Sequence, residues 1–399
     1  MENEVSKLNI SDGDTNIVNN QKNCSYCNKS LAEELWCKEC DPFRMIEGWT
    51  SGNPDIDKFV KDTMYNARNL TYIRHPFLEW VTLDRFTDIK EIDEGSFSKV
   101  YSATWIDGKS EYYKNNDGSY KKVNLEPMMV VALKRLIGSQ NIKNKFLSEL
   151  KIHWKVCMLY GFDFYGLTKD PETSEFIMII RFADKGNLRS ILSKNFNDMF
   201  WQNKINLLHK LSYDLQSFHS LGYFHGQFHS KNILQDHNLF FISDFGLCGP
   251  SSKDNGVYYG VVPYIAPEVL SGTQYELSSD IYSFGVVMTE LSTGRRPFCN
   301  ENYDSRLIFA ICINGLRPEF GKGTPEFYEE LAYKCMNENP NERPTAEELF
   351  DIFNFWLDSI RGRKDEEECF SYKGKEIKDA FEEADKEISN ISTSYKKGF

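Results

Sequence analysis

The sequence lacks a hydrophobic run long enough to cross a membrane. Its densest apolar stretches, FIMII at 176–180 and FGVVM at 284–288, are short, whereas a membrane-spanning helix needs about 18 or more apolar residues in succession. The first residues, MENEVSKLNISDGD, also lack the basic and apolar regions of a signal peptide. We therefore expect no membrane partner and a cytoplasmic or nuclear location.

Basic residues are also outnumbered by acidic ones, with 47 Lys and Arg against 59 Asp and Glu. The 399 residues carry a formal net charge of -12, and a nucleic-acid backbone attracts a basic surface rather than an acidic one. A nucleic-acid partner is therefore not expected. With 41% hydrophobic and 27% charged residues, the chain has the composition of a globular protein with a sizeable core.

Closely spaced cysteines are too few for a disulfide framework, because six of the ten are scattered along the chain. The other four form two C-x-x-C pairs with nine residues between them, Cys24 with Cys27 and Cys37 with Cys40. Four thiolates at this spacing can converge tetrahedrally on Zn²⁺. We predict a zinc-ribbon-like four-cysteine module at 23–41 with a structural ion; metal-free thiols and a redox pair are the alternatives.

The segments around this module show weaker patterns. Residues 1–22 are polar and poor in aromatics, and we predict that they are disordered. Residues 42–85 read as a linker with a short helix, because NPDIDKFVKDTMYN at 53–66 places four apolar residues on one helical face: Ile56, Phe59, Val60 and Met64.

Strand patterns begin near Phe86 and give way to helical patterns after residue 186. KVYSATW at 99–105 alternates as a strand does, MMVVALKRL and FIMIIRF read as further strands, and NKFLSELKIHWKVC has a helical period. Two helical stripes follow, Ile205 to Phe218 and Ile281 to Leu291. We predict a small sheet with one helix, a larger helical body, and a charged tail at 357–399 whose helix is marginal.

Several short motifs follow one another along this part of the chain. In order, they are the stretch IDEGSFSKV at 92–100, Lys134 in VVALK, Glu149, the loop from His225 to Asn232, Asp244-Phe245-Gly246, Ala266-Pro267-Glu268, Asp280 and Arg343. Singly, each is more often ordinary: a glycine between strands is usually a turn, and a strand lysine is usually a solvated charge. Together and in this order they resemble the protein kinase family, and within it the tyrosine-kinase-like branch.

The resemblance covers residues 86–356 and implies a fold. That fold is α+β and two-lobed, with a small antiparallel sheet and one helix in the N-lobe at 86–180. A hinge follows at 181–184, and a larger helical C-lobe at 185–356. The resemblance also implies ATP and Mg²⁺ as cofactors, and a protein substrate or partner that the sequence does not identify.

The resemblance implies roles for the matching residues. Lys134 would contact the α- and β-phosphates and pair with Glu149, while Asp244 and Asn232 would each coordinate Mg²⁺. The hinge backbone at Arg181 and Ala183 would meet the adenine. Further nucleotide contacts would come from the glycine stretch, the strands beside it, the hinge and the catalytic loop: Ile92, Gly95, Val100, Ala132, Ala183 and Lys231.

Three other motif residues would be structural. Glu268 and Arg343 resemble the buried ion pair that anchors the activation segment of the family, and Asp280 resembles the aspartate that braces the catalytic loop. Lys231 stands where one group of tyrosine kinases carries an arginine, so it would place a cation near the phosphates.

The catalytic loop departs from the family at its most important position. His225, Gly226 and Gln227 stand in the places of His-Arg-Asp, so the carboxylate that accepts the proton of the substrate hydroxyl is missing. A glutamine can orient that hydroxyl by a hydrogen bond but cannot act as a base. Loss of general-base catalysis typically lowers the rate about 10²- to 10⁴-fold.

The glycine stretch departs as well, since Asp93 and Ser98 replace the first and third glycines of the family pattern. We interpret the chain as a pseudokinase that binds Mg-ATP and acts in signalling by interaction. The alternative is an active Ser/Thr or Tyr kinase with low, base-independent activity; Val261 does not decide between the two specificities. A third hypothesis makes the zinc module the functional part, as a binder of RNA or a protein tail.

Overall fold

The computed structural model describes residues 49–67, 77–95, 98–114, 120–124, 126–140, 144–160, 163–246, 248–250, 260–369 and 371–391. The segments 1–22 and 23–41, with Cys24, Cys27, Cys37 and Cys40, lie outside these residues, so their disorder and the zinc module stay predictions. The chain forms two compact units. Unit 1 comprises Met1–Trp80 and Asp107–Pro127, and unit 2 comprises Val81–Ile106 and Met128–Phe399.

Unit 1 contains the helix that the sequence predicts in the linker, α2 (Pro54–Ala67). The side chain of Asn53 accepts hydrogen bonds from the N–H groups of Asp55 (2.9 Å) and Ile56 (3.2 Å), as a helix cap does. The predicted apolar face is buried, as the exposures of its four residues confirm: Ile56 0%, Phe59 6%, Val60 0% and Met64 0%.

Unit 1 also contains β1 (Glu79–Trp80) and an antiparallel hairpin of β4 (Ser110–Lys114) and β5 (Tyr120–Asn124). A buried ion pair joins the hairpin to the strand before it. Lys109 Nζ lies 3.1 Å from Glu79 Oε1 and donates to the carbonyl of Phe77 at 2.7 Å. The start of the hairpin is therefore anchored to the segment around β1 within unit 1.

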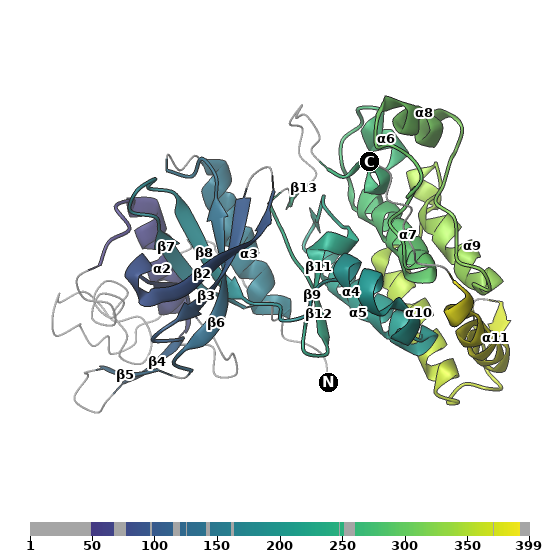
Figure 1. Ribbon diagram of the computed structural model, residues 1–399, viewed down its shortest axis with the longest axis horizontal. Coiled ribbons are helices and arrows are strands. Elements are labelled where there is room, and N and C mark those ends of the chain that lie inside the picture. Colours follow the sequence, from purple (N-terminus) through teal and green to yellow (C-terminus); the bar gives the residue numbers. More distant parts are fainter. Residues whose placement is uncertain are drawn as a thin grey trace, which may run out of the picture. The chain divides into compact units, whose positions relative to one another are not determined.

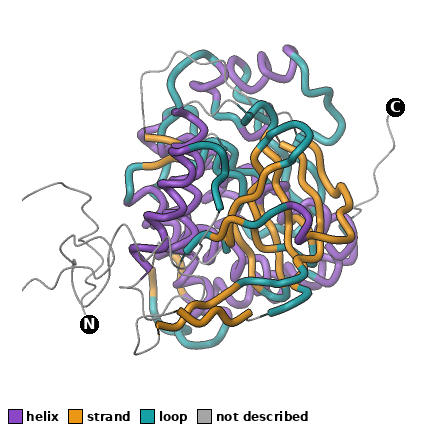
Figure 2. Tube along the Cα trace, turned by 90° about the vertical axis from the view of Figure 1, so that its left-hand side faces the viewer, coloured by secondary structure: helices purple, strands orange, loops and turns teal. Residues whose placement is uncertain are grey.

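Unit 2 begins with an antiparallel sheet. After the 3₁₀ helix η1 (Leu83–Arg85), its strands are β2 (Phe86–Glu94), β3 (Ser98–Trp105), β6 (Met129–Leu136), β7 (Phe164–Lys169) and β8 (Phe176–Arg181). Within unit 2 they pair in the order β7-β8-β6-β3-β2, and they lie side by side in one layer (Figure 2). Helix α3 (Asn144–Tyr160) lies beside this sheet (Figure 1).

The rest of unit 2 is mainly helical, as predicted. Its short strands are β9 (Gly186–Asn187), β10 (Tyr223–Phe224), β11 (Ile233–Asp236), β12 (Leu239–Ile242) and β13 (Gly249–Pro250), and its 3₁₀ helices are η2 (Phe196–Asp198), η3 (Ser230–Asn232), η4 (Val262–Tyr264) and η5 (Pro340–Glu342). Its α-helices up to residue 360 are α4 (Leu188–Asn195), α5 (Trp201–Ser220), α6 (Pro267–Leu270), α7 (Leu277–Thr293), α8 (Ser305–Ile313), α9 (Glu326–Cys335) and α10 (Ala346–Ile360).

One apolar core holds these helices together, and both predicted stripes lie in it. Ile205, Leu208, Leu211 and Leu215 of α5 and Phe284 and Met288 of α7 are each 0% exposed. In Figure 1, α5 runs beside α10, and α7 beside α9. In the part of the chain that the structure describes, no helix is both long and apolar enough to cross a membrane.

The C-terminal segment differs from the charged tail expected at 357–399. After a small hairpin of β14 (Glu368–Cys369) and β15 (Tyr372–Lys373), helix α11 (Gly374–Glu387) packs into the same core and ends in η6 (Ile388–Asn390). Its buried residues Ile377, Phe381 and Ala384 form one face against α5 and α10. A helix that is marginal alone is stabilised when its apolar face has a partner surface, so the described part of this segment is packed on the core.

Candidate active site

The loop His225–Asn232 between β10 and β11 is held by one carboxylate. Asp280, fully buried in the first turn of α7, accepts hydrogen bonds from the backbone N–H groups of His225 (2.7 Å) and Gly226 (3.0 Å). It also contacts His219 Nε2 (3.0 Å) and the Tyr275 hydroxyl (2.9 Å). Burial alone raises the pKa of Asp280, but the hydrogen bond and charge of His219 lead the interactions that lower it overall. The predicted bracing of the loop is confirmed.

Within the loop, the backbone at Gly226 and Gln227 is fixed by a left-handed turn and by hydrogen bonds to other loop residues. Gly226 has a φ of 77°, a left-handed conformation that glycine adopts at little cost. The backbone N–H of Gln227 donates to His225 Nδ1 (3.2 Å), and its carbonyl accepts from Asn232 Nδ2 (3.0 Å). The loop is therefore closed by its own hydrogen bonds while position 227 carries an amide in place of a carboxylate.

Lys134 and Asp244 are brought together from distant parts of the chain. Lys134, on β6 and 6% exposed, places its Nζ 2.6 Å from Asp244 Oδ1. Burial alone raises the pKa of Asp244, but the charge and the hydrogen bond of Lys134 outweigh it and lower that pKa to about 2. Asp244 is therefore ionised at neutral pH. The side chain of Glu149, on α3, lies outside the described residues, so its predicted pairing with Lys134 stays a prediction.

One face of the sheet carries three predicted nucleotide residues. Ala132 and Lys134 are two residues apart on β6 and so share a face, and Val100 of β3 lies directly opposite Lys134. Asp93 of β2 lies opposite Val100 in the next pair. This register places the carboxylate that replaces the family's first glycine at the edge of the predicted nucleotide surface.

The other predicted nucleotide residues lie at the borders of that surface. Ile92 on β2 is 51% exposed, and Gly95 donates its N–H to the carbonyl of Ser98 at 2.8 Å, which closes the turn between β2 and β3. Ala183 follows β8, and its carbonyl accepts from Gly186 N–H at 3.1 Å. Arg181, the last residue of β8, forms an ion pair with Asp163 at 2.5 Å.

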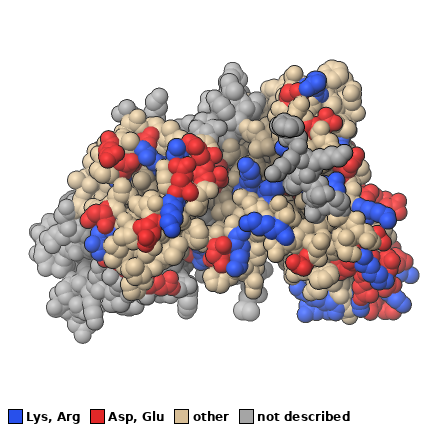
Figure 3. Space-filling model, viewed as in Figure 1, with Lys and Arg blue, Asp and Glu red and all other residues tan. Residues whose placement is uncertain are grey.

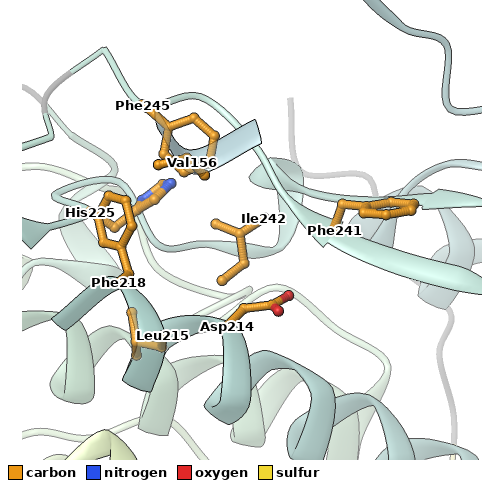
Figure 4. Close-up of a pocket in the computed structure, with 8 residues that line it drawn as sticks. All are labelled: Val156, Asp214, Leu215, Phe218, His225, Phe241, Ile242 and Phe245. Atoms are coloured by element: carbon orange, nitrogen blue, oxygen red, sulfur yellow. The ribbon is translucent and has the colours of Figure 1, made fainter. Parts of the chain in front are cut away.

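Phe245 packs among aromatic rings behind the catalytic loop. Its ring centroid lies 5.1 Å from that of His153 and 5.3 Å from that of His225. Burial lowers the pKa of both histidines, that of His153 to about 3. Figure 4 shows His225, Phe218 and Phe245 lining a cavity of about 20 Å³, with the carboxylate of Asp214 at its lower edge. That volume holds about one water molecule, so it is too small for a substrate.

A buried polar cluster, which the sequence did not predict, lies beneath the loop. Glu290 of α7, 0% exposed, forms an ion pair with Arg189 of α4 and accepts a hydrogen bond from the Tyr264 hydroxyl. Arg189 also donates to Tyr264 (2.6 Å) and to Ser230 Oγ (3.1 Å). The cluster links the catalytic loop to residues 260–265. The sequence carried no signal for this cluster, because a single Arg or Glu in a helix usually faces solvent.

The predicted pair of Glu268 and Arg343 is confirmed. Two parallel hydrogen bonds join them, both 2.7 Å, and Arg343 is 6% exposed. Arg343 also donates to the carbonyls of Asn337 (2.9 Å) and Ser278 (3.0 Å). This bidentate geometry is the strong form of a carboxylate–guanidinium contact, and it fixes the start of α6 to the segment before α10.

The donor set fits Mg²⁺. Asp244 offers an ionised carboxylate, and Asn232 uses its amide nitrogen to close the loop, which leaves its amide oxygen as an acceptor. Mg²⁺ prefers hard oxygen ligands and usually takes one or two from the protein and others from phosphates and water. Asp244 and Asn232 would therefore supply oxygen ligands of the kind that such a site uses.

A two-lobed fold with this arrangement defines a protein kinase domain. A family model described as protein tyrosine and serine/threonine kinase matches residues 86–353, more than half of the chain. The chain therefore belongs to the protein kinase family, whose members are phosphotransferases that generally use ATP and Mg²⁺.

Individual relatives are more distant. The chain is 26% identical over 287 residues to a probable serine/threonine-protein kinase of Dictyostelium discoideum, covering 68% of this chain and 15% of the relative. It is 28% identical over 301 residues to a putative serine/threonine-protein kinase/receptor of Acanthamoeba polyphaga mimivirus, covering 74% and 17%. A mitogen-activated protein kinase kinase of Pyricularia oryzae is 26% identical over 259 residues, covering 59% and 60%. The chain thus spans only a small part of the first two relatives.

Proposed function

We propose that this protein kinase family member binds Mg-ATP and acts in signalling mainly by interaction, as a pseudokinase with strongly reduced phosphotransfer. The observation that carries the proposal is Gln227 in a loop that is otherwise closed and braced by Asp280. Lys134 and Asp244 remain in contact nearby at 2.6 Å. Nucleotide-binding residues are therefore kept where the proton acceptor is replaced.

Each of these residues has a task that does not need a base. Lys134 holds the α- and β-phosphates as a cation, and Asn232 and Asp244 hold Mg²⁺ through oxygen atoms. When bound, Mg²⁺ neutralises charge on the phosphates. The Gln227 amide orients the acceptor hydroxyl, whose proton then has no carboxylate to receive it. Such a site is expected to bind nucleotide well and to transfer phosphate slowly.

Restoring the carboxylate tests the proposal. We expect Gln227→Asp to raise autophosphorylation by about 10²- to 10⁴-fold, the range that general-base catalysis supplies. Phosphate incorporation with Mg-ATP measures it, beside a thermal-shift assay for nucleotide binding. Gln202→Asp, an exposed position on α5, is the matched control and should change neither. Wild-type turnover at the family norm of roughly 1 to 100 per second would contradict the proposal.

The alternative is an active kinase with low, base-independent activity. The intact contact of Lys134 with Asp244 favours it, because positioning and charge supply most of the catalysis of phosphoryl transfer. A measurable wild-type baseline that Asp244→Asn removes would select this alternative, and no detectable phosphotransfer by wild type would exclude it.

Two finer assignments belong to the same proposal. Membership of the tyrosine-kinase-like branch is supported by the order of motifs, while Val261 matches neither the threonine usual in Ser/Thr kinases nor the tyrosine-kinase pattern. A structural Zn²⁺ on Cys24, Cys27, Cys37 and Cys40 is supported by their spacing. Zinc analysis of the purified chain tests it, and one ion per chain is the expected result.

A further inference from the structure

Three side chains that can ligate a metal ion meet at the end of the predicted hinge. Asp184 is the last hinge residue, Asp236 ends β11, and His237 follows it in the turn to β12. Each offers one ligand atom, and the three atoms lie within 4.8 Å of one another. The backbone N–H of His237 donates to Asp184 Oδ1 (2.9 Å), and His237 Nδ1 lies 2.9 Å from Asp236 Oδ1. We call these three side chains the hinge cluster.

The backbone fixes the two segments that carry the hinge cluster. β11 pairs with both β9 and β12, and the three strands lie together in Figure 1. The N–H of Lys185 donates to the carbonyl of Gln235 (3.1 Å), and Gln235 Nε2 donates to the carbonyl of His237 (3.1 Å). The cluster is therefore built on a small sheet, which holds residues that are about fifty positions apart in the chain at a defined separation.

The carboxylate of Asp236 has few partners for its degree of burial. Its side chain is 17% exposed, and among the described residues it contacts His237 Nδ1 and, at 3.5 Å, Arg181 Nη1. Arg181 lies closer to Asp163, at 2.5 Å, so its contact with Asp236 is weak. A carboxylate has about four acceptor sites, and a mostly buried one is costly unless its charge is compensated. A cation bound by Asp236 would supply that compensation.

The carboxylate of Asp184 has a partner that a metal ion could displace. Lys185 Nζ lies 3.1 Å from Asp184 Oδ2, and the lysine side chain is 55% exposed. In Figure 3, acidic and basic side chains lie next to one another on the face that carries β11 and β12. Because an exposed ion pair contributes little free energy, the ammonium group moves into solvent at a small cost. Lys185 therefore competes with a metal ion for Asp184, and its removal should strengthen metal binding.

The donors of the hinge cluster select the class of ion. An imidazole nitrogen together with carboxylate oxygens suits Zn²⁺ and similar divalent transition metals, whereas Mg²⁺ and Ca²⁺ prefer oxygen ligands alone. Zn²⁺ holds such ligands at about 2.0–2.2 Å, so that neighbouring ligands of a tetrahedral ion lie about 3.4 Å apart. The three donor atoms would therefore have to move by about 1 Å, which rotation of their side chains provides.

We propose that the hinge cluster binds one divalent transition-metal ion of the zinc class, with water in the remaining coordination position. The ion joins the end of the hinge to the β11–β12 turn through its ligands. None of the three side chains is assigned to ATP or Mg²⁺, so the inference does not rest on the proposed function. It is also separate from the predicted four-cysteine module, with which it shares no residue.

Zinc titration of the full chain tests the inference. Zn²⁺ is added to the purified chain without nucleotide, and isothermal titration calorimetry gives the number of ions bound and their affinities. We expect His237→Asn to weaken one site at least tenfold, because loss of even an outer partner of a metal ligand costs about 10- to 100-fold. His209→Asn, which removes a half-buried imidazole on α5, is the matched control and should change neither quantity.

Two further variants separate loss of a ligand from loss of the fold. Asp184→Asn keeps an oxygen for the N–H of His237 but removes the charge, and it should weaken the same site. Lys185→Gln removes the competing ammonium group and should strengthen the site by up to about fivefold, a gain that damage to the fold would not produce. Circular dichroism spectra check that each variant folds, and Asp184→Asn and Lys185→Gln decide the question if His237→Asn does not.

Weakened binding in His237→Asn and Asp184→Asn with stronger binding in Lys185→Gln supports the inference. The same ion count and affinities in wild type, Asp184→Asn and Lys185→Gln would overturn it, as would an equal loss in His209→Asn. Displacement of Zn²⁺ from this site by excess Mg²⁺ would show an unselective acidic surface and would also overturn it. Wild-type phosphotransfer at the family norm would contradict the proposed function and would leave these outcomes unchanged.

Discussion

Two buried charges in the helical part of unit 2 have opposite surroundings. Asp280 lies beneath the catalytic loop, is 0% exposed, and contacts four donor groups. Lys204 lies on α5 beside α11 and is equally buried, but among the described residues its Nζ has no hydrogen-bond partner. Asp280 thus fixes backbone N–H groups of the catalytic loop, whereas Lys204 forms no hydrogen bond with the described residues.

The rings around Lys204 do not replace a counter-ion. Its Nζ lies 4.3 Å from the ring centroid of Phe196 and 4.6 Å from that of Trp201. Burial lowers the pKa of Lys204 to about 7, although the charge of Asp385 on α11 acts in the other direction. A buried charge therefore fixes a defined geometry only where it has hydrogen-bond partners: donors around a carboxylate, or acceptors around an ammonium group.

The same difference separates the supports of the active site from its contact positions. Asp280 and the Glu268–Arg343 pair hold their partners in short hydrogen bonds. Gln227 and Asp93, which would face the acceptor hydroxyl and the phosphates, are among the positions that differ from the family pattern. The supports of the predicted site are therefore present in the structure, whereas the differences from the family pattern lie at its predicted contact positions.

Removing the carboxylate of Asp280 should have the largest effect. Asp280→Ala leaves buried donors of the catalytic loop unpaired, and we expect the free energy of unfolding to fall by about 3–5 kcal/mol. Chemical denaturation followed by circular dichroism measures it. Asp351→Ala, an exposed position on α10, is the control and should change stability little. If both variants lose equally little, the loop is held by other contacts.

Removing the positive charge of Lys134 should have the next largest effect, which is on nucleotide affinity. Lys134→Met eliminates a charge-assisted contact to phosphate, worth about 1.5–3 kcal/mol, so nucleotide affinity should fall at least tenfold. Titration of Mg-ATP in a thermal-shift assay measures it, with Lys151→Met on the exposed face of α3 as the control. A wild-type shift in Lys134→Met would show that the nucleotide does not use this contact.

Lys204→Met should change stability in the opposite direction. The substitution removes an unpaired buried charge, and we expect the free energy of unfolding at pH 7 to rise by roughly 2 kcal/mol. Because the pKa of Lys204 is lowered to about 7 in the folded chain, the unfolded chain binds more protons between pH 7 and about 10.5. Wild-type stability should therefore increase across this window, by at most about 1.4 kcal/mol per pH unit.

Denaturation at pH 7, 8 and 9 checks both parts of this prediction. The Lys204→Met variant should lack the increase, while Lys194→Met, on the exposed side of α4, should keep the wild-type dependence. A destabilised Lys204→Met variant with an unchanged pH dependence would show that Lys204 has a counter-ion or water in solution, and the contrast with Asp280 would then disappear.

Much of the fold could be predicted because local periodicity and burial agree in it. The apolar stripe of α5 and the alternation in β3 correspond to buried faces, and the stripe of α7 lies in a helix that is buried on all sides over residues 279–292. The packing of helix α11 could not be predicted, because it depends on contact with α5 and α10 and not on the helix's own propensity. The anchoring of the β4–β5 hairpin could not be predicted either, because Lys109 and Glu79 belong to segments that are distant in the chain.

The sequence by itself predicted the family, which the family model then showed, and it predicted the register of the catalytic loop with Gln227 at the position of the base, because motif order and residue identity are properties of the chain. The tertiary structure alone decided which charges meet. Lys134 reaches Asp244, Arg189 neutralises Glu290, and Lys204 lies against the rings of Phe196 and Trp201. These contacts depend on the folded distance between residues that are far apart in the chain and on how deeply each is buried. The strength of an electrostatic interaction follows from both quantities.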